Sequence, residues 1–158
     1  MTRPFRLAAL AIASALVLAA CGSSSSTSST TSTATSSPRP ASIVGTKTSS
    51  LGTFLVDSKG RALYLWDADH SSKSTCSGAC AQAWPPLTTT GTPKASGAAK
   101  ASLLSTTTRA DGSREVTYAG HPLYSFAGDT TPGQTTGQGS DGFGSPWWVV
   151  SPAGRAIQ

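Results

Sequence analysis

The chain has 158 residues, of which 37% are hydrophobic and only 12% charged, and its formal net charge is +5. Loss of a leader containing Arg3 and Arg6 would reduce this charge to +3, and no basic run is interleaved with aromatic residues. The sequence therefore shows no nucleic-acid-binding footprint. Glycine, serine, threonine and proline are abundant and long helical patterns are absent, which argues against a helical protein.

Residues 1–20 have the pattern of a bacterial signal peptide, with a basic start and an apolar run from Leu7 to Val17 that is too short to span a bilayer comfortably. The run ends in "LAAC", which resembles a lipobox and implies that Cys21 is lipidated. An ordinary secretory signal with a leftover cysteine is the alternative. We expect a lipoprotein whose acyl chains place it at the extracytoplasmic face of the cell membrane, with the membrane as its partner.

Residues 21–42 contain the lipidated cysteine followed by a run composed almost entirely of Ser, Thr, Gly and Pro. Such a segment has no apolar surface with which to offset the entropy of ordering, and it is predicted to be a flexible tether. The remaining residues, 43–158, are enough for one domain with a single modest core.

The first part of this domain predicts a hairpin and a helix. The runs "GTFLVD" and "RALYLW" are rich in strand-forming residues and are joined by Ser58-Lys59-Gly60, where glycine supplies a positive φ. One short helix is predicted near 78–84, in "GACAQAW", because Pro85 and Pro86 end it.

The second part predicts further hairpins. "ASLLSTTT" and "SREVTYA" flank Ala110-Asp111-Gly112, and Asp-Gly is a strong turn signal. "HPLYSFA" and "PWWVVS" are predicted strands, and the glycine-rich run from Gly137 to Gly144 is predicted to be a mobile surface loop. The final "VVSPAGRAI" copies the first hairpin in its glycine, its Arg-Ala pair and its apolar flanks.

The chain also repeats one heptapeptide pattern, Leu-Tyr-x-aromatic-x-x-Asp, at Leu63–Asp69 and again at Leu123–Asp129. Two repeats, about 51–100 and 101–158, would each cover the apolar face of the other. Strand alternation places Leu63 and Leu65 on one face and Tyr64 and Trp66 on the other, so this strand should be central. We predict an all-β domain of antiparallel strands that forms a small sandwich or closed barrel.

The pattern "LYLWDAD…STCSGACAQAWPPL", followed by "TYAGHPLYSFAGDTTPGQTTGQG", resembles the family of predicted bacterial lipoproteins with the Y-x-[FWY]-x-x-D motif, also described as a secreted repeat of unknown function. The resemblance covers nearly all of residues 51–154. It implies tandem repeats and a lipid-anchored extracytoplasmic location, and it implies no activity. The positions that match the motif are Tyr64, Trp66, Asp69, Tyr124, Phe126 and Asp129.

Two interpretations of the motif residues follow. The aromatic side chains can form a core, in which case Tyr64→Phe should be tolerated, or they can floor a ligand cleft with Trp147 and Trp148 at its mouth. Asp69 and Asp129 lie in turn-like sequence and can accept hydrogen bonds from backbone N–H groups two residues on. Alternatively, they are paired carboxylates that bind a metal or act as acid and base.

Cys76 and Cys80 are expected to form a disulfide in an exported protein. The alternative is a copper or zinc site, or a redox site, in which His70 joins the two thiolates. His121 begins the second Tyr strand and, next to Pro122, is expected to be an extended hairpin residue.

No nucleophile–base arrangement or phosphate-binding loop is recognisable, so we expect no enzyme and no cofactor. The preferred interpretation is a non-enzymatic binding or structural module of the cell envelope. A metal-binding or electron-transfer lipoprotein is the first alternative, and capture of an apolar small molecule such as a hydrocarbon is the second.

Overall fold

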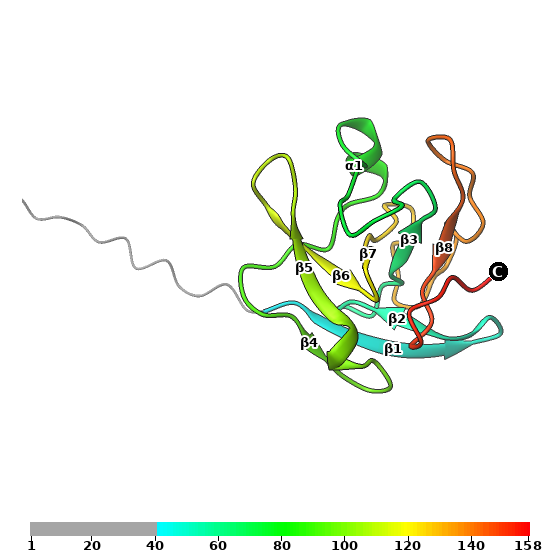
Figure 1. Cartoon of the computed structure of the whole chain (residues 1–158). Helices are drawn as coiled ribbons and strands as arrows, with labels where there is room; N and C mark the ends of the chain where they lie inside the picture. Colours follow the sequence, from blue (N-terminus) through cyan, green and yellow to red (C-terminus); the bar gives the residue numbers. More distant parts are fainter. Residues whose placement is uncertain (1–40) are drawn as a thin grey trace, which may run out of the picture. The chain divides into compact units, whose positions relative to one another are not determined.

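The structure is a computed structural model that describes residues 41–158, all of which fall within one compact unit (Figure 1). The expected signal peptide, Cys21 and most of the tether lie outside the described residues. The strands are β1 (Ile43–Ser49), β2 (Gly52–Val56), β3 (Tyr64–Trp66), β4 (Lys94–Ala95), β5 (Leu104–Thr108), β6 (Arg114–Tyr118), β7 (His121–Pro122) and β8 (Trp147–Val149). Within residues 41–158, no helix has the length and apolar character needed to cross a membrane.

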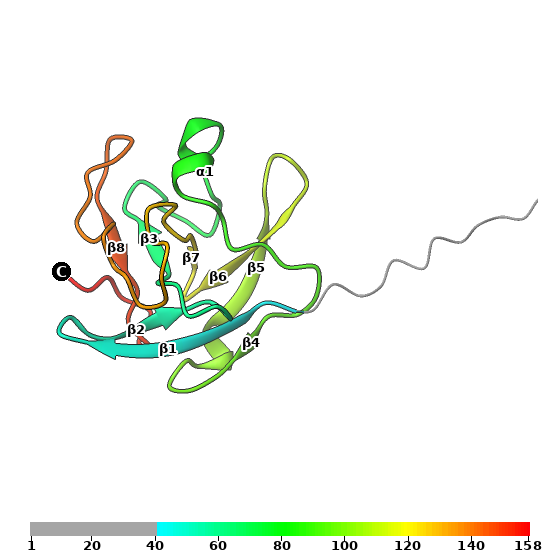
Figure 2. The same cartoon turned by 180° about the vertical axis from the view of Figure 1, so that it is seen from behind.

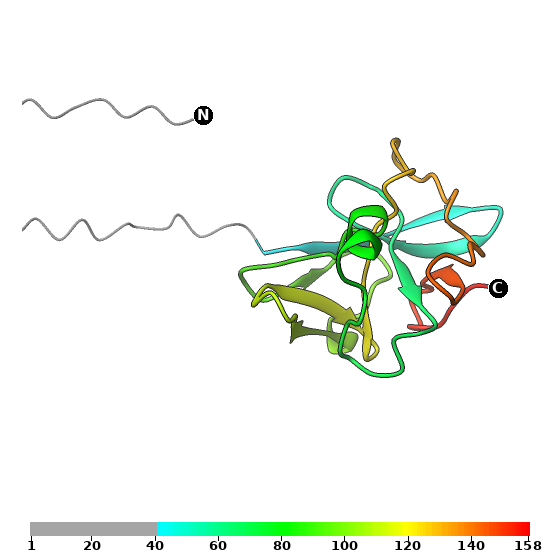
Figure 3. The same cartoon turned by 90° about the horizontal axis from the view of Figure 1, so that it is seen from above.

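The helix α1 (Ala79–Ala83) lies where the sequence predicts it, before the two prolines. It occupies the end of the domain opposite β1 and β2 (Figures 1 and 2), and Figure 3 views the domain from that end. A 3₁₀ turn, Ala101–Leu103, was not predicted, because the run "ASLLSTTT" reads as one strand from its first residue.

The strands form three small sheets, in the orders β2-β1-β4, β3-β8 and β5-β6-β7. Neighbouring strands are antiparallel except for β4, which runs parallel to β1. The all-β class is therefore confirmed, whereas no closed barrel forms among residues 41–158. The sheets stay small because strands leave one partner for another after two to five residues instead of continuing one ladder.

Three tight turns share one backbone pattern, and each ends at a glycine with positive φ. Gly60, Gly112 and Gly154 have φ angles of 77°, 80° and 80°. The amide of each glycine donates to the carbonyl three residues earlier, at distances of 2.8–3.0 Å. Only glycine adopts this backbone conformation without a steric cost. The predicted similarity of the first and last hairpins is confirmed, since the bridge Val56↔Ala62 is matched by Val150↔Ala156.

The first hairpin is shorter than predicted. The segment after Gly60 pairs with β2 only around Ala62, and β3 then pairs with β8 instead. Strand β3 lies between β7 and β8 (Figures 1 and 2). Because both faces of β3 are apolar, a two-stranded hairpin alone would leave one face in water.

The backbone shows that the two repeats are interleaved. Leu55 N–H donates to Val150, Val150 to Leu63, and Leu63 back to Leu55, with N···O distances of 2.8–3.1 Å. The second repeat forms the same triangle from Val116 to Leu87, Leu87 to Leu123, and Leu123 to Val116, at 2.8–3.0 Å. Leu87 thus comes from the first half of the chain to complete the second repeat, and Val150 makes the reverse exchange.

The core consists of two buried clusters that meet along β3. Tyr64 and Trp66 point into a cluster that also contains the disulfide, and Leu63 and Leu65 point into the other. The predicted alternation of this strand is therefore confirmed, as is its central position.

Candidate functional site

The two Tyr-x-aromatic-x-x-Asp motifs bind each other across the interface between the repeats. The Tyr64 hydroxyl donates to Asp129 Oδ2 at 2.6 Å, and the Tyr124 hydroxyl donates to Asp69 Oδ2 at 2.5 Å. Each tyrosine therefore uses the aspartate of the other motif. The two tyrosines also pair through their backbones, with N···O distances of 2.8 and 3.0 Å.

The second oxygen of each aspartate organises the loop that follows it. Asp69 Oδ1 accepts the amide and hydroxyl of Thr75, and Asp129 Oδ1 accepts those of Thr136, at 2.6–2.9 Å. Each aspartate accepts a backbone N–H as expected, but the donors lie six and seven residues further along the chain and not two. Both aspartates have a hydrogen bond to each oxygen, so their burial is compensated.

The motif tyrosines remain protonated donors at physiological pH. Burial, reinforced by the hydrogen bond to Asp129, raises the pKa of the Tyr64 hydroxyl far above its ordinary value. Burial, together with the negative charge of Glu115 and the bond to Asp69, does the same for the pKa of Tyr124. A donor of this kind fixes geometry and has no accessible anionic form with which to act as a base.

The aromatic residues form a continuous stack in place of a ligand cleft. Trp66, Trp147, Trp84 and Phe126 follow one another with ring centroids 5.1, 4.0 and 4.4 Å apart. Tyr64 and Tyr124 abut the two central rings edge-on, at 5.2 and 5.1 Å. The expected core assignment therefore holds, and the aromatic cleft expected as an alternative is filled by the rings themselves. Trp148 is half-buried and donates to Asp67 at 3.0 Å.

Cys76 and Cys80 are joined by a disulfide that links the loop after β3 to α1. His70 is exposed, and no group of three or more metal-ligating side chains occurs within residues 41–158. Since metals bind thiolates, a copper or zinc site at Cys76, Cys80 and His70 would first require reduction. His121 lies half-buried at the start of β7, where it pairs with Tyr118.

The glycine-rich run from Gly137 to Gly144 is bonded to the domain along its length. Trp147 accepts from Gly139 N and donates from its backbone to Ser140 O and from its indole to Gly142 O, at 2.8–2.9 Å. The side chain of Gln138 donates to Ile157 O at 2.6 Å and accepts from Val149 N at 2.9 Å. Beyond these bonds, Phe143 is an exposed apolar residue with positive φ.

An ion pair buried beside the motifs was missed by sequence reasoning. Glu115 on β6 is completely buried, and its Oε2 lies 2.7 Å from Nη1 of Arg109, whose side chain is 6% exposed. The missed signal is a difference between the repeats. The matching backbone bonds of Leu55 and Val116 place Glu115 at the position that Phe54 occupies in the first repeat.

Arg109 connects this ion pair to the motif and to the disulfide loop. Its Nη1 donates to Ser74 Oγ and its Nη2 to Cys76 O, both at 2.5 Å. Ser74 Oγ also lies 2.6 Å from the Tyr124 hydroxyl oxygen, whose single proton is directed to Asp69. Burial raises the pKa of Glu115 to about 7, although the Arg109 ion pair acts in the opposite direction. Glu115 is therefore a buried acid that can change its charge near neutral pH.

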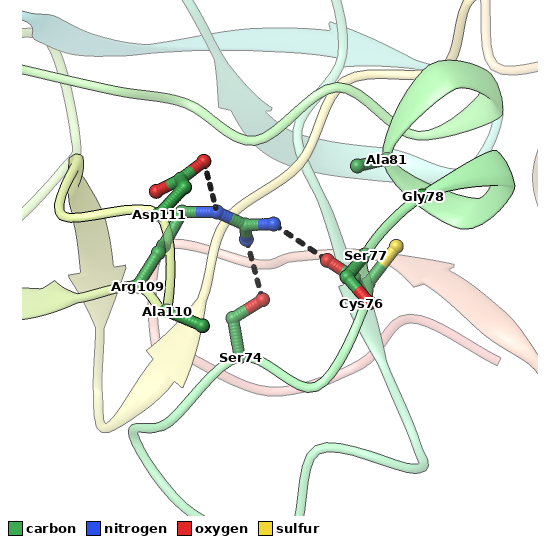
Figure 4. A pocket seen from close by; sticks show the side chains of 8 residues that line it. All are labelled: Ser74, Cys76, Ser77, Gly78, Ala81, Arg109, Ala110 and Asp111. Carbon is green, nitrogen blue, oxygen red and sulfur yellow. Dashed lines mark hydrogen bonds and ion pairs between the residues drawn. The ribbon is translucent and has the colours of Figure 1, made fainter.

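A pocket opens beside this network (Figure 4), with a volume of about 220 Å³. Figure 4 shows the Arg109 guanidinium between Asp111 on one side and Ser74 and Cys76 on the other. We name it the Arg109 pocket, and it is lined by Ser74, Cys76, Ser77, Gly78, Ala81, Arg109, Ala110 and Asp111.

Comparison with known protein families gives a match in both repeats. A family model described as "secreted repeat of unknown function" matches residues 45–88 and 105–151, one segment in each repeat. Neither the curated proteins nor the solved structures contain a match.

Proposed function

Because the chain belongs to the family of secreted repeats of unknown function, we propose that it is a non-enzymatic cell-envelope module, held at the extracytoplasmic face of the bacterial membrane by lipid on Cys21. On this proposal, the folded residues bind or support a component of the envelope. The Ser- and Thr-rich segment holds them within reach of the membrane.

The exchange of tyrosine and aspartate between the motifs carries the proposal. All four polar side chains are buried and hydrogen-bonded to each other, and none faces the Arg109 pocket. Groups engaged in this way stabilise a fold and offer no reactive atom to a substrate. The arrangement favours a rigid module over a catalyst as the role of the motif.

The lipid anchor is supported by sequence alone, through "LAAC" at residues 18–21. A bacterial host that processes lipoproteins should place the full-length chain in the membrane fraction. The mature N-terminal peptide should show a mass increase equal to two or three acyl chains. The matched control is Cys21→Ala, which should leave the membrane fraction. Recovery of the unsubstituted chain in the soluble fraction, without acyl mass, would refute the anchor.

A further inference from the structure

The Arg109 guanidinium holds hydrogen-bond donors that its protein neighbours do not use. A guanidinium carries five N–H groups. Three donate to Ser74, Glu115 and Cys76. The fourth, on Nε, has no hydrogen-bond acceptor among residues 41–158, and Nη2 has one further N–H beyond its bond to Cys76. The Nε and Nη2 donors lie on the edge of the guanidinium that binds planar oxyanions in a bidentate way.

The rim of the pocket carries the opposite charge. Asp111 Oδ2 lies 3.9 Å from Arg109 Nε, which is an ion-pair distance but too long for a hydrogen bond. Asp111 Oδ1 is already occupied by the amide and hydroxyl of Ser113, at 2.9 and 2.6 Å. These bonds lower the pKa of Asp111, and its side chain is 65% exposed. Arg109 Nε is itself buried, so a ligand carboxylate can reach this unused donor only by entering between the guanidinium and the Asp111 carboxylate.

We propose that the Arg109 pocket binds a small zwitterion of the α-amino acid type, with its carboxylate on the Nε and Nη2 edge of Arg109 and its ammonium on Asp111 Oδ2. The proposal rests on the function proposed above and names the ligand class of that binding module. The buried guanidinium supplies the specific contact, and Asp111 selects for a cation on the neighbouring carbon.

Size and charge both favour this ligand class. A volume of about 220 Å³ equals that of roughly seven water molecules at ~30 Å³ each. It is below the ~300 Å³ at which sites for drug-sized ligands begin. Gly78, Ala81 and Ala110 leave the space open because their side chains are small or absent. With Glu115 neutral, Arg109 and Asp111 together carry no net charge, which suits a zwitterion. With Glu115 ionised the site is negative, and a phosphate dianion would be repelled by both Asp111 and Glu115.

Glu115 should couple this binding to pH. The groups around it are Arg109, Ser74, Asp69 and Tyr124. When Glu115 is ionised, it competes with the ligand carboxylate for the positive charge of Arg109. When Glu115 is neutral, this competition is absent and the ligand carboxylate is attracted more strongly. Binding should therefore strengthen as the pH falls through about 7, and binding should take up a proton.

The test uses the full-length chain with Cys21→Ser, which removes the lipid and keeps every residue of the pocket. Binding is measured by ligand-observed nuclear magnetic resonance with glycine, L-alanine and D-alanine as probes. Acetate, methylamine and inorganic phosphate serve as comparison compounds. We expect at least one amino acid to bind with a dissociation constant on the order of 1 mM. Acetate and methylamine should each bind at least tenfold more weakly, because each makes half of the contacts.

Two variants test the contacts. Asp111→Asn keeps an oxygen for the bonds from Ser113 but removes the charge, and it should weaken amino acid binding about tenfold. Ala81→Leu fills the pocket from α1 with a residue of high helix propensity and should abolish binding. The matched control is Asp141→Asn, an exposed aspartate outside the pocket, which should leave binding unchanged.

Three results would overturn the inference: no saturable binding of any of the amino acids, phosphate binding tighter than theirs, or binding that survives both Asp111→Asn and Ala81→Leu. Loss of the lipid anchor would instead appear in the membrane fractionation described above. Failure of the ligand and failure of the anchor can therefore be told apart.

Discussion

The exchange between the motifs replaces the sequence-based expectation that Tyr64→Phe is tolerated, because the hydroxyl is bonded to a buried carboxylate, and it makes a quantitative prediction for this substitution. The substitution preserves the ring and its edge-on contact with Trp84. It removes the 2.6 Å bond to Asp129 and the bond that the Tyr64 hydroxyl accepts from the backbone N–H of Gly137. A hydrogen bond to a charged group contributes ~1.5–3 kcal/mol, and an unpaired buried acceptor adds to the loss. Asp129 keeps its bonds to Thr136 on the other oxygen, so we expect a total loss of about 3 kcal/mol in the free energy of unfolding.

The third buried tyrosine supplies a matched control. The Tyr118 hydroxyl donates to Pro152 O and accepts from Lys100 N, both at 2.8 Å, so its partners are neutral backbone groups. Tyr118→Phe should therefore cost only about 1 kcal/mol. Both variants bury a phenyl ring at a fully buried site, and the difference between them isolates the charge of the acceptor.

The assay is urea unfolding of the full-length Cys21→Ser chain, monitored by tryptophan fluorescence. With a slope of ~1–3 kcal/mol per molar urea, a 3 kcal/mol loss moves the midpoint by about 1–3 M. Asp129→Asn completes a double-mutant cycle with Tyr64→Phe, and the coupling energy should be about 2 kcal/mol. The reasoning fails if Tyr64→Phe costs no more than Tyr118→Phe, because the motif tyrosine would then act only as an aromatic filler.

Three further predictions concern pH and oxidation state. The folded-state pKa of Glu115, about 7, lies above its unfolded value. Proton binding by Glu115 therefore stabilises the fold fully below the unfolded pKa, and this stabilisation is lost as the pH rises through 7. Urea midpoints should fall over this pH range, Glu115→Gln should flatten the fall, and an unchanged profile would contradict the assignment. The pKa values of Tyr64 and Tyr124 are raised above those of the unfolded chain, so stability is lost as the pH rises above ~10, where unfolded tyrosines ionise. Ultraviolet titration should show the tyrosinates of these two residues only together with unfolding. Ionisation of all tyrosines in the folded chain would disprove this prediction. Intact mass before and after reduction should differ by two hydrogens because Cys76 and Cys80 are bonded, whereas free thiols carrying copper or zinc would favour the metal alternative.

Sequence patterns predicted those features of the fold that depend on neighbouring residues. The turns at Gly60 and Gly112 could be located because their backbone conformation needs glycine. The two faces of β3 could be assigned because alternation is local. The family motif could be found because it is written twice, and its aromatic residues were correctly assigned to the core.

The missed features depend on contacts between distant parts of the chain. Nothing local indicates that Asp69 binds Tyr124 or that Asp129 binds Tyr64, since a turn-like aspartate has nearer partners available. Glu115 was overlooked because four of the five residues in β6 are buried, so the strand shows no alternation from which an inward-facing charge could be recognised. Comparison of Phe54 with Glu115 would have revealed it, once the two repeats were aligned.

The interleaving of the repeats also bears on how such a chain could arise. The tyrosine of each repeat is bonded to the aspartate of the other repeat, so one repeat alone would leave both groups without their partners. The segment around Leu87 likewise completes the backbone triangle of the second repeat and not that of the first repeat, from which it comes. A single copy is therefore self-complementary, and two identical copies would satisfy each other through a twofold axis. The present chain is in effect a covalently fused dimer. Its halves differ at one matched position, where Glu115 stands in the second repeat and Phe54 in the first, so only the second repeat has a buried ion pair at this point.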